Sequence, residues 1–185
     1  MNHYIVCDLE ATCFPKNSFG QPKTSEIIEI GAVWCDKEFN ILSEFDEFVK
    51  PTVHKTLSDY CTNLTTIKQS DVDTALKFPE VLNNFITWME QCTIHFAAHG
   101  IFCSWGDYDR KQFIKDCAFH NVPYPFDIQH INLKGMYGKL MNCKPCGMKE
   151  AMNQCNLDLA GCHHRGIDDS RNIAKICKYI INKDK

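Results

Sequence analysis

The chain has 185 residues, which fits one domain of ordinary size. Its 20 Lys and Arg against 23 Asp and Glu give a formal net charge of -3, which argues against a protein that coats nucleic acid through charge alone. With 44% hydrophobic and 23% charged residues, the composition excludes a disordered or fibrous chain, and no apolar run is long enough to cross a membrane.

The first residues and the cysteines indicate the compartment. Asp8 and Glu10 lie where a signal peptide would need its apolar stretch, so we predict a cytoplasmic protein without membrane contact. The sequence contains 12 cysteines, most of them inside apolar segments such as IVCDL and AKICKYI. Because free cysteine behaves as a small hydrophobic residue, we expect reduced thiols in the core and no disulfide scaffold.

The first half of the chain predicts a group of strands. Alternating or apolar segments indicate strands over residues 3–11, 26–35 and 39–49. The last two are joined by the polar turn Asp36-Lys37. Residues 12–25, rich in Pro, Lys, Ser and Gly, read as a loop, and residues 50–77 as short helical turns.

The second half alternates helices with short strands. Apolar periodicity predicts helices over 79–91, 107–120, 131–141, 147–155 and 168–181, and strands over 93–100 and 126–131. This order of elements predicts an α/β fold with a mixed sheet covered by helices, in a single domain over residues 1–185.

Two acids on the first strand stand out. Side chains alternate along a strand, so Asp8 and Glu10 point to the same face. Like charges held together in a partly buried place repel each other unless a cation lies between them. The simpler alternative is a strand end that reaches solvent.

Two helices each direct a further acid inward. Asp169 lies four residues before Ile173 on the apolar stripe of the last helix, whereas Asp168 lies on the outward side and suits the helix N-terminus. Asp109 shares a helix face with Phe113 and Cys117, whereas Asp107 has Lys111 as an ion partner at i+4. Simple N-capping is the alternative explanation for Asp109 and Asp169.

Four carboxylates without cysteine ligands suit hard cations such as Mg²⁺ or Mn²⁺. Such a set is typical of a two-metal phosphoryl-transfer site, which also needs a general base. His164, five residues before Asp169, suits this role, and the adjacent His163 faces elsewhere if this loop is extended. An exposed loop histidine without a function is the alternative.

These residues and the segments around them resemble one family. Asp8-x-Glu10, Asp109 and His164-x4-Asp169 resemble the pattern of the DEDDh 3'→5' exonucleases. The stretches DLEATC (8–13), EIIEIGAV (26–33), KPTV…LSDYCTNLTTI (50–67), SWGDYDRKQF (104–113) and HHRGIDDSRNIAKI (163–176) are similar to the branch that contains the histone-mRNA 3'-end exonuclease and the Eri-type exoribonucleases.

The resemblance implies an RNase H-like fold with a mixed five-stranded sheet flanked by helices. It also implies hydrolysis of single-stranded RNA 3' ends to nucleoside 5'-monophosphates with two Mg²⁺ or Mn²⁺ ions. Asp8, Glu10, Asp109 and Asp169 would be the metal ligands and His164 the base. Asp109 is preferred over Asp107 because the family's ligand directly follows an aromatic residue, here Tyr108.

Several residues are candidates for holding the terminal nucleotide. Ala11 and Thr12 could contact its sugar and Leu9 or Phe14 its base, while Phe14 and Trp105 could stack on bases or simply pack in the core. A lysine-rich stretch over residues 134–149 could follow phosphates or form a solvated face.

Two other features admit a plainer explanation. Cys143 and Cys146, with Cys155, Cys162 and His163 downstream, have a spacing that could suit structural zinc, although nothing in the resemblance requires zinc there. Glu26 and Glu29 on the second strand are expected to be surface acids. The alternative functions are a DNA-directed 3'→5' exonuclease, a catalytically silent nucleic-acid-binding domain and a zinc-stabilised interaction module.

Overall fold

The computed structural model of the protein describes residues 2–15, 24–126 and 129–183. Over these residues the chain forms a mixed sheet of six strands in the order β4-β3-β2-β1-β5-β6. The strands are β1 (Asn2–Ala11), β2 (Ile27–Cys35), β3 (Ile41–Lys50), β4 (Leu76–Lys77), β5 (His99–Ser104) and β6 (His130–Asn132). The predicted α/β fold is confirmed, and the strand beyond the expected five is the two-residue β4 at the edge.

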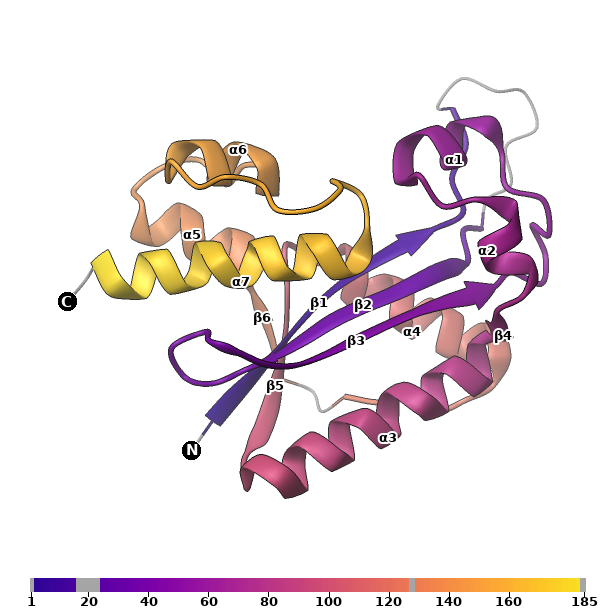
Figure 1. The fold of residues 1–185 in the computed structure, drawn as a ribbon, viewed down its shortest axis with the longest axis horizontal. Helices are drawn as coiled ribbons and strands as arrows, with labels where there is room; N and C mark the ends of the chain where they lie inside the picture. Colours follow the sequence, from indigo (N-terminus) through magenta and orange to yellow (C-terminus); the bar gives the residue numbers. More distant parts are fainter. Residues whose placement is uncertain (1, 16–23, 127–128, 184–185) are drawn as a thin grey trace.

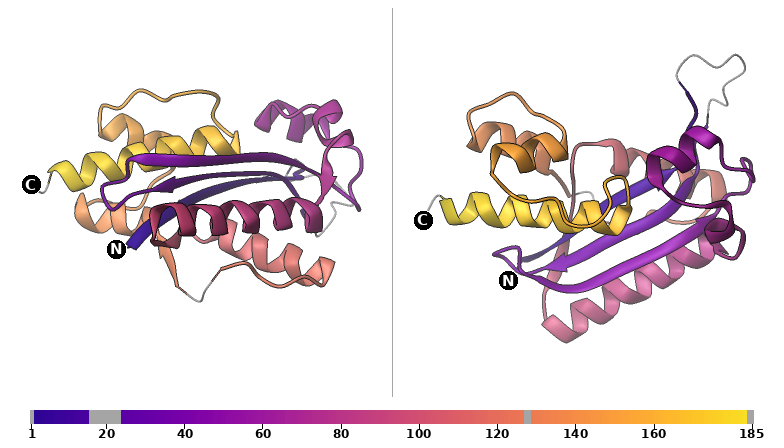
Figure 2. Two further views of the ribbon diagram at one scale, coloured as in Figure 1. Left: turned by 60° about the horizontal axis from the view of Figure 1, so that its bottom comes forward. Right: turned by 45° about the horizontal axis from the view of Figure 1, so that its top comes forward.

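Helices cover both faces of the sheet (Figures 1 and 2). α3 (Phe78–Phe96) and α4 (Tyr108–His120) pack on one face around Trp34 and Phe85. α5 (Leu133–Leu140), α6 (Met148–Gln154) and α7 (Gly166–Lys183) pack on the other face around Tyr137 and Ile176. The short helices α1 (Asp59–Thr65) and α2 (Gln69–Asp73) add a small third cluster.

The prediction of a strand over residues 93–100 was wrong. α3 continues to Phe96, the chain turns at Ala97 with a left-handed φ of 47°, and β5 begins at His99. Met89, Cys92 and Phe96 prolong the apolar stripe of the helix against the sheet, so helical periodicity prevails over the apolar run. The strand expected over 126–131 shortens to β6, and residues 127 and 128 lie outside the described residues.

A close approach between α7 and β2 determines where the site forms. A Cβ atom on Gly31 would lie 2.0 Å from backbone atoms of Gly166 and Ile167, so only glycine fits there. A Cβ atom on Gly166 would lie 2.8 Å from the carbonyl oxygen of Asp8. The first turn of α7 therefore rests directly on the sheet, which brings Asp169 to the acids of β1.

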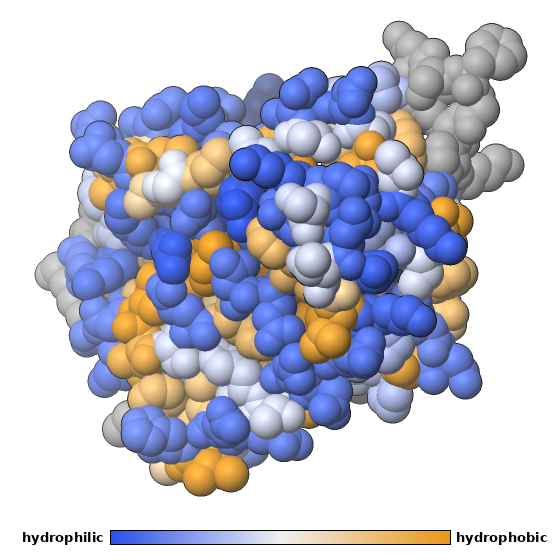
Figure 3. Space-filling model, turned by 45° about the vertical axis from the view of Figure 1, so that its right-hand side comes forward, coloured by the Kyte–Doolittle hydropathy of each residue, from blue (hydrophilic) through white to orange (hydrophobic). Residues whose placement is uncertain are grey.

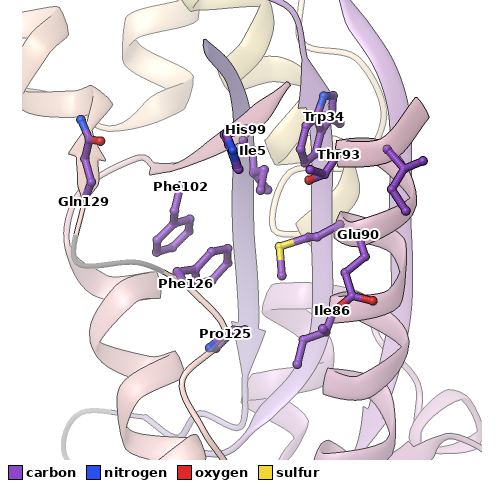
Figure 4. A pocket seen from close by; sticks show the side chains of 13 residues that line it. Ile5, Trp34, Ile86, Glu90, Thr93, His99, Phe102, Pro125, Phe126 and Gln129 are labelled. Atoms are coloured by element: carbon purple, nitrogen blue, oxygen red, sulfur yellow. The ribbon is translucent and has the colours of Figure 1, made fainter. Parts of the chain in front are cut away.

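A separate cavity of about 410 Å³ with a mixed but mostly apolar lining lies between α3 and the strands β1 and β5 (Figure 4). Its lining includes Ile5, Phe102 and Phe126 and shares no residue with the pocket that contains the acids. On the face of the molecule seen in Figure 3, hydrophilic side chains predominate and hydrophobic ones form separate patches. Over the described ranges, the structure contains no helix with the length and apolar character needed to span a membrane.

Candidate active site

A pocket of about 300 Å³ at the carboxyl end of β1 collects the predicted catalytic residues. Its lining includes all five of them: Asp8, Glu10, Asp109, His164 and Asp169. One carboxylate oxygen each from Asp8, Glu10 and Asp169 lies within 4.8 Å of the other two. Asp109 lines the same pocket without belonging to this closest group.

Asp109 is fixed by the backbone of β1. The Leu9 N–H, located between the two acids of the strand, donates a hydrogen bond of 3.1 Å to Asp109 Oδ1. Asp109, Phe113 and Cys117 are all buried, as the helical phase predicted. Asp107 instead lies 4.0 Å from Arg110 and 3.7 Å from His130, in place of the expected pairing with Lys111.

Asp169 is held by the histidine segment that precedes α7. The backbone N–H of His164 donates to Asp169 Oδ2 at 3.0 Å, and His163 Nδ1 lies 3.0 and 3.2 Å from the two carboxylate oxygens. The two imidazoles stack with their ring centroids 3.9 Å apart. The prediction that His163 faces away was wrong, because the left-handed φ of 65° at His164 replaces the extended loop that the prediction assumed.

A partly buried ion pair also positions this segment. Glu29 is fully buried and accepts hydrogen bonds from Arg165 Nε and Nη2 and from the Gly166 N–H. Since Arg165 directly follows His164, this ion pair fixes the segment to β2. Burial raises the pKa of Glu29 to about 7 although Arg165 opposes the shift.

Glu29 and Glu26 were wrongly predicted as surface acids. All nine residues of β2 are buried, because β1 and β3 flank the strand and helices cover both of its faces. Glu26, just before β2, accepts hydrogen bonds from the N–H groups of Thr52, Val53 and His54. Burial raises the pKa of Glu26, but these bonds outweigh it and leave the pKa below its usual value.

Burial and mutual repulsion raise the pKa values of the carboxylates in the pocket. Loss of surrounding water, followed by the charge of Asp109, raises the pKa of Asp8 well above its usual value. Burial and the charge of Glu29 raise the pKa of Glu10 to about 9. Burial raises the pKa of Asp109 to about 6, against the hydrogen bond from Leu9, and burial also raises the pKa of Asp169. Such a group cannot be fully ionised near neutral pH without a compensating cation.

This electrostatic strain predicts that the metal-free protein loses stability as the pH rises from about 4.5 to about 9. In the folded chain Glu10 keeps its proton up to a pKa of about 9, whereas its usual pKa is 4.5. The folded state therefore binds more protons across this range, and the free energy of unfolding falls as the pH increases. Urea unfolding in the presence of a chelator measures the slope.

The same titration with Mg²⁺ is the control for this prediction. A cation that binds the ionised carboxylates of the folded state should remove most of the decline, because ligand binding to the folded state adds to stability. A free energy of unfolding that stays constant or rises with pH in the chelator would contradict the electrostatic account.

The predicted substrate contacts divide into two groups. Leu9, Ala11 and Trp105 line the pocket, and the Trp105 indole N–H donates to the Cys146 carbonyl at 3.0 Å. Thr12 and Phe14 do not line it: Thr12 accepts a hydrogen bond from the Glu26 N–H, and Phe14 packs edge-on against His54. We therefore leave Thr12 and Phe14 out of the proposed substrate site.

Sequence reasoning missed several residues that line the pocket: Cys13, Leu64, Tyr108, Met148 and His163. Only two of them carried a signal, Tyr108 as the aromatic residue before Asp109 and His163 as the neighbour of His164. Cys13 follows β1 directly along the chain, whereas Leu64 and Met148 belong to α1 and α6, which only the tertiary fold brings to the carboxyl end of β1.

The positions of the cysteines agree better with the predicted reduced thiols in the core than with a zinc site. Eight cysteines are buried and all 12 are free thiols. Among the described residues, no group of three potential metal ligands includes Cys143 or Cys146. Both are half-buried and pack against the cluster under α7.

Residues 5–177 match the family model RNase_T, described as Exonuclease. The chain is 32% identical to ERI1 exoribonuclease 2 of Xenopus laevis, over 97% of this chain and 28% of that protein. It is also 32% identical to 3'-5' exoribonuclease 1 of Homo sapiens, over 97% of this chain and 52% of that protein. The chain thus spans only part of the length of these curated relatives.

A solved structure is similar over nearly the whole chain. The nuclease domain of 3'hExo, a DEDDh family member bound to rAMP, superposes with a TM-score of 0.90 at 30% sequence identity. The superposition covers 98% of this chain and 92% of that domain.

Proposed function

Because this chain belongs to the RNase_T family of exonucleases, we propose that it hydrolyses single-stranded RNA from the 3' end to nucleoside 5'-monophosphates. The observation that carries the proposal is the convergence of four carboxylates and an imidazole, from β1, α4, α7 and the segment before α7, in one pocket. Two observations support RNA as the substrate class. The relatives are named exoribonucleases, and the solved nuclease domain is bound to rAMP. We treat residues 1–185 as a single exonuclease domain, and the cytoplasmic location stays a prediction.

In this proposal Asp8, Glu10, Asp109 and Asp169 hold two divalent cations. The donor set fits: it consists of crowded carboxylate oxygens whose raised pKa values call for positive charge, and oxygen ligands suit Mg²⁺ or Mn²⁺. When bound, the ions supply Lewis-acid activation of the attacking water and stabilisation of the leaving 3'-oxygen.

His164 then accepts the proton of the attacking water. Its imidazole lines the pocket, and burial together with the neighbouring His163 lowers its pKa, so the neutral form is available at neutral pH. Asp169 holds the backbone of His164 in place through the 3.0 Å hydrogen bond from its N–H. Lys149, the last lysine of the 134–149 stretch, is exposed and directly follows Met148 of the pocket lining, so it is the lysine of that stretch that we propose for a phosphate contact.

Leu9, Ala11 and Trp105 are the proposed contacts of the terminal nucleotide. They line the pocket next to the carboxylates and offer apolar and aromatic surface to a base or sugar. Neither this surface nor the carboxylates distinguish ribose from deoxyribose, so single-stranded DNA is the alternative substrate.

A time course on a 5'-labelled single-stranded RNA tests the proposal. We expect a ladder that shortens from the 3' side with Mg²⁺ or Mn²⁺ and stays intact with a chelator, and release of nucleoside 5'-monophosphates. A DNA of the same sequence, run in parallel, decides the substrate class. Intact RNA with both ions, or shortening that persists in the chelator, would overturn the proposal.

A further inference from the structure

Asp8, Glu10 and Asp169 offer oxygen ligands alone, and a second group of side chains that could hold a metal ion shares Asp169 with them but adds nitrogen ligands. His163, His164 and Asp169 each offer one ligand atom, and these atoms lie within 4.8 Å of one another. We propose that these three residues form an inhibitory site for Zn²⁺ or a similar borderline divalent metal ion. The inhibitory consequence rests on the proposed function; the binding site itself does not.

The spacing of the first two ligands already suits zinc. Zinc bonds of about 2.0–2.2 Å to imidazole nitrogen and carboxylate oxygen, at a tetrahedral angle, place the two ligand atoms roughly 3.3 Å apart. His163 Nδ1 lies 3.0 and 3.2 Å from the two oxygens of Asp169. A zinc ion would therefore take the place of the proton that the imidazole and the carboxylate share.

His164 supplies the third ligand once its ring turns out of the stack with His163. Its ring stacks on His163 at 3.9 Å between centroids, and its ligand atom lies within 4.8 Å of the other two. Because the ring is half-buried and lines a pocket of about 300 Å³, it has room to turn toward the ion. Two imidazoles and one carboxylate are a common zinc-ligand set that leaves a fourth position open.

The ligand chemistry separates this site from the one for the hydrolytic ions. Mg²⁺ prefers oxygen ligands, whereas imidazole favours zinc and other later transition metals. Zinc at His163, His164 and Asp169 would occupy the nitrogen of the proposed base and one carboxylate of the proposed metal centre. Inhibition should therefore occur at low zinc concentration despite excess Mg²⁺.

Zinc binding without any assay of hydrolysis tests the site directly. In an Asp8→Asn protein, in which the group of Asp8, Glu10 and Asp169 has lost one carboxylate, we expect competition with a chromophoric chelator to detect one bound Zn²⁺. Adding His163→Phe, which keeps an aromatic ring on His164 but no ligand atom, should weaken zinc binding by at least about tenfold. His95→Phe, at an exposed histidine on α3, is the matched control and should leave it unchanged.

The hydrolysis assay tests inhibition separately. Each variant's hydrolysis rate is first expressed relative to its own rate without zinc. The zinc concentration that halves this relative rate should be at least about tenfold higher for His163→Phe than for the unchanged chain. Equal zinc affinity with and without His163, in a variant that circular dichroism finds folded, would overturn the site. Equal half-inhibition would overturn the inhibitory role. Absence of hydrolysis from every variant would instead refute the proposed function, while the binding assay still decides the site.

Discussion

Asp8→Asn is expected to reduce RNA hydrolysis to background, by about 10³-fold or more, because the loss of one ligand removes several kcal/mol of transition-state stabilisation by the divalent ions. Asn is nearly the same size as Asp, and Asp8 is close to Glu10 and Asp169 without serving as a cap, so the fold should persist. The rate of RNA shortening at saturating Mg²⁺ measures the loss, and circular dichroism reports the fold.

The start of α4 supplies a matched pair of controls. Asp109→Asn should be as inactive as Asp8→Asn, since Asp109 is 4% exposed and accepts the Leu9 N–H inside the pocket. Asp107→Asn should keep most of its activity, because that side chain is 46% exposed and pairs with Arg110 and His130. An inactive Asp107 variant together with an active Asp109 variant would assign the metal ligand to Asp107 in place of Asp109.

Asp8→Asn, which removes one charge from the carboxylates of the pocket, should increase the stability of the metal-free protein although it abolishes activity. In a chelator above neutral pH, Asp8→Asn should unfold at a higher urea concentration than the unchanged chain, because one repelling carboxylate is gone. A less stable variant would mean that Asp8 has a structural role that its contacts do not suggest.

His164→Asn is expected to lower kcat by about 10²–10⁴-fold, the usual contribution of a general base. Asparagine tolerates the left-handed φ of 65° at this position better than most residues, and it retains the N–H that Asp169 accepts. The substitution thus removes proton acceptance while the backbone and the four carboxylates stay in place. Steady-state kinetics give kcat, and Mn²⁺ binding measured by electron paramagnetic resonance should be nearly unchanged.

His163→Phe is the comparison that separates the two stacked imidazoles. We expect a much smaller loss than for His164→Asn, because His163 contacts Asp169 and no proposed proton-transfer step requires its nitrogen. A severe loss in His163→Phe together with an active His164→Asn would assign the base to His163.

Local periodicity was sufficient to predict which four acids point toward one another. Strand alternation put Asp8 and Glu10 on one face, and helical spacing turned Asp109 and Asp169 inward, because both patterns depend only on backbone geometry. The resemblance to the DEDDh exonucleases, carried by the same residues, is confirmed by the family match over residues 5–177.

The sequence failed where a side chain depends on what covers it. Glu29 and Glu26 looked like surface acids because nothing local reveals that β2 is enclosed on all sides. The strand expected over 93–100 failed because the extent of α3 depends on its packing against the sheet.

Strand alternation, helical phase and the family pattern thus predicted from the sequence alone which acids lie in one pocket and which chemistry they favour. The tertiary structure decided how that site is supported: the contact of Gly31 with Gly166, the partly buried ion pair of Glu29 and Arg165, and the stacking of His163 on His164. The first two contacts join residues more than 130 positions apart, and the third depends on the left-handed backbone at His164. Neither feature produces a periodic pattern in the sequence.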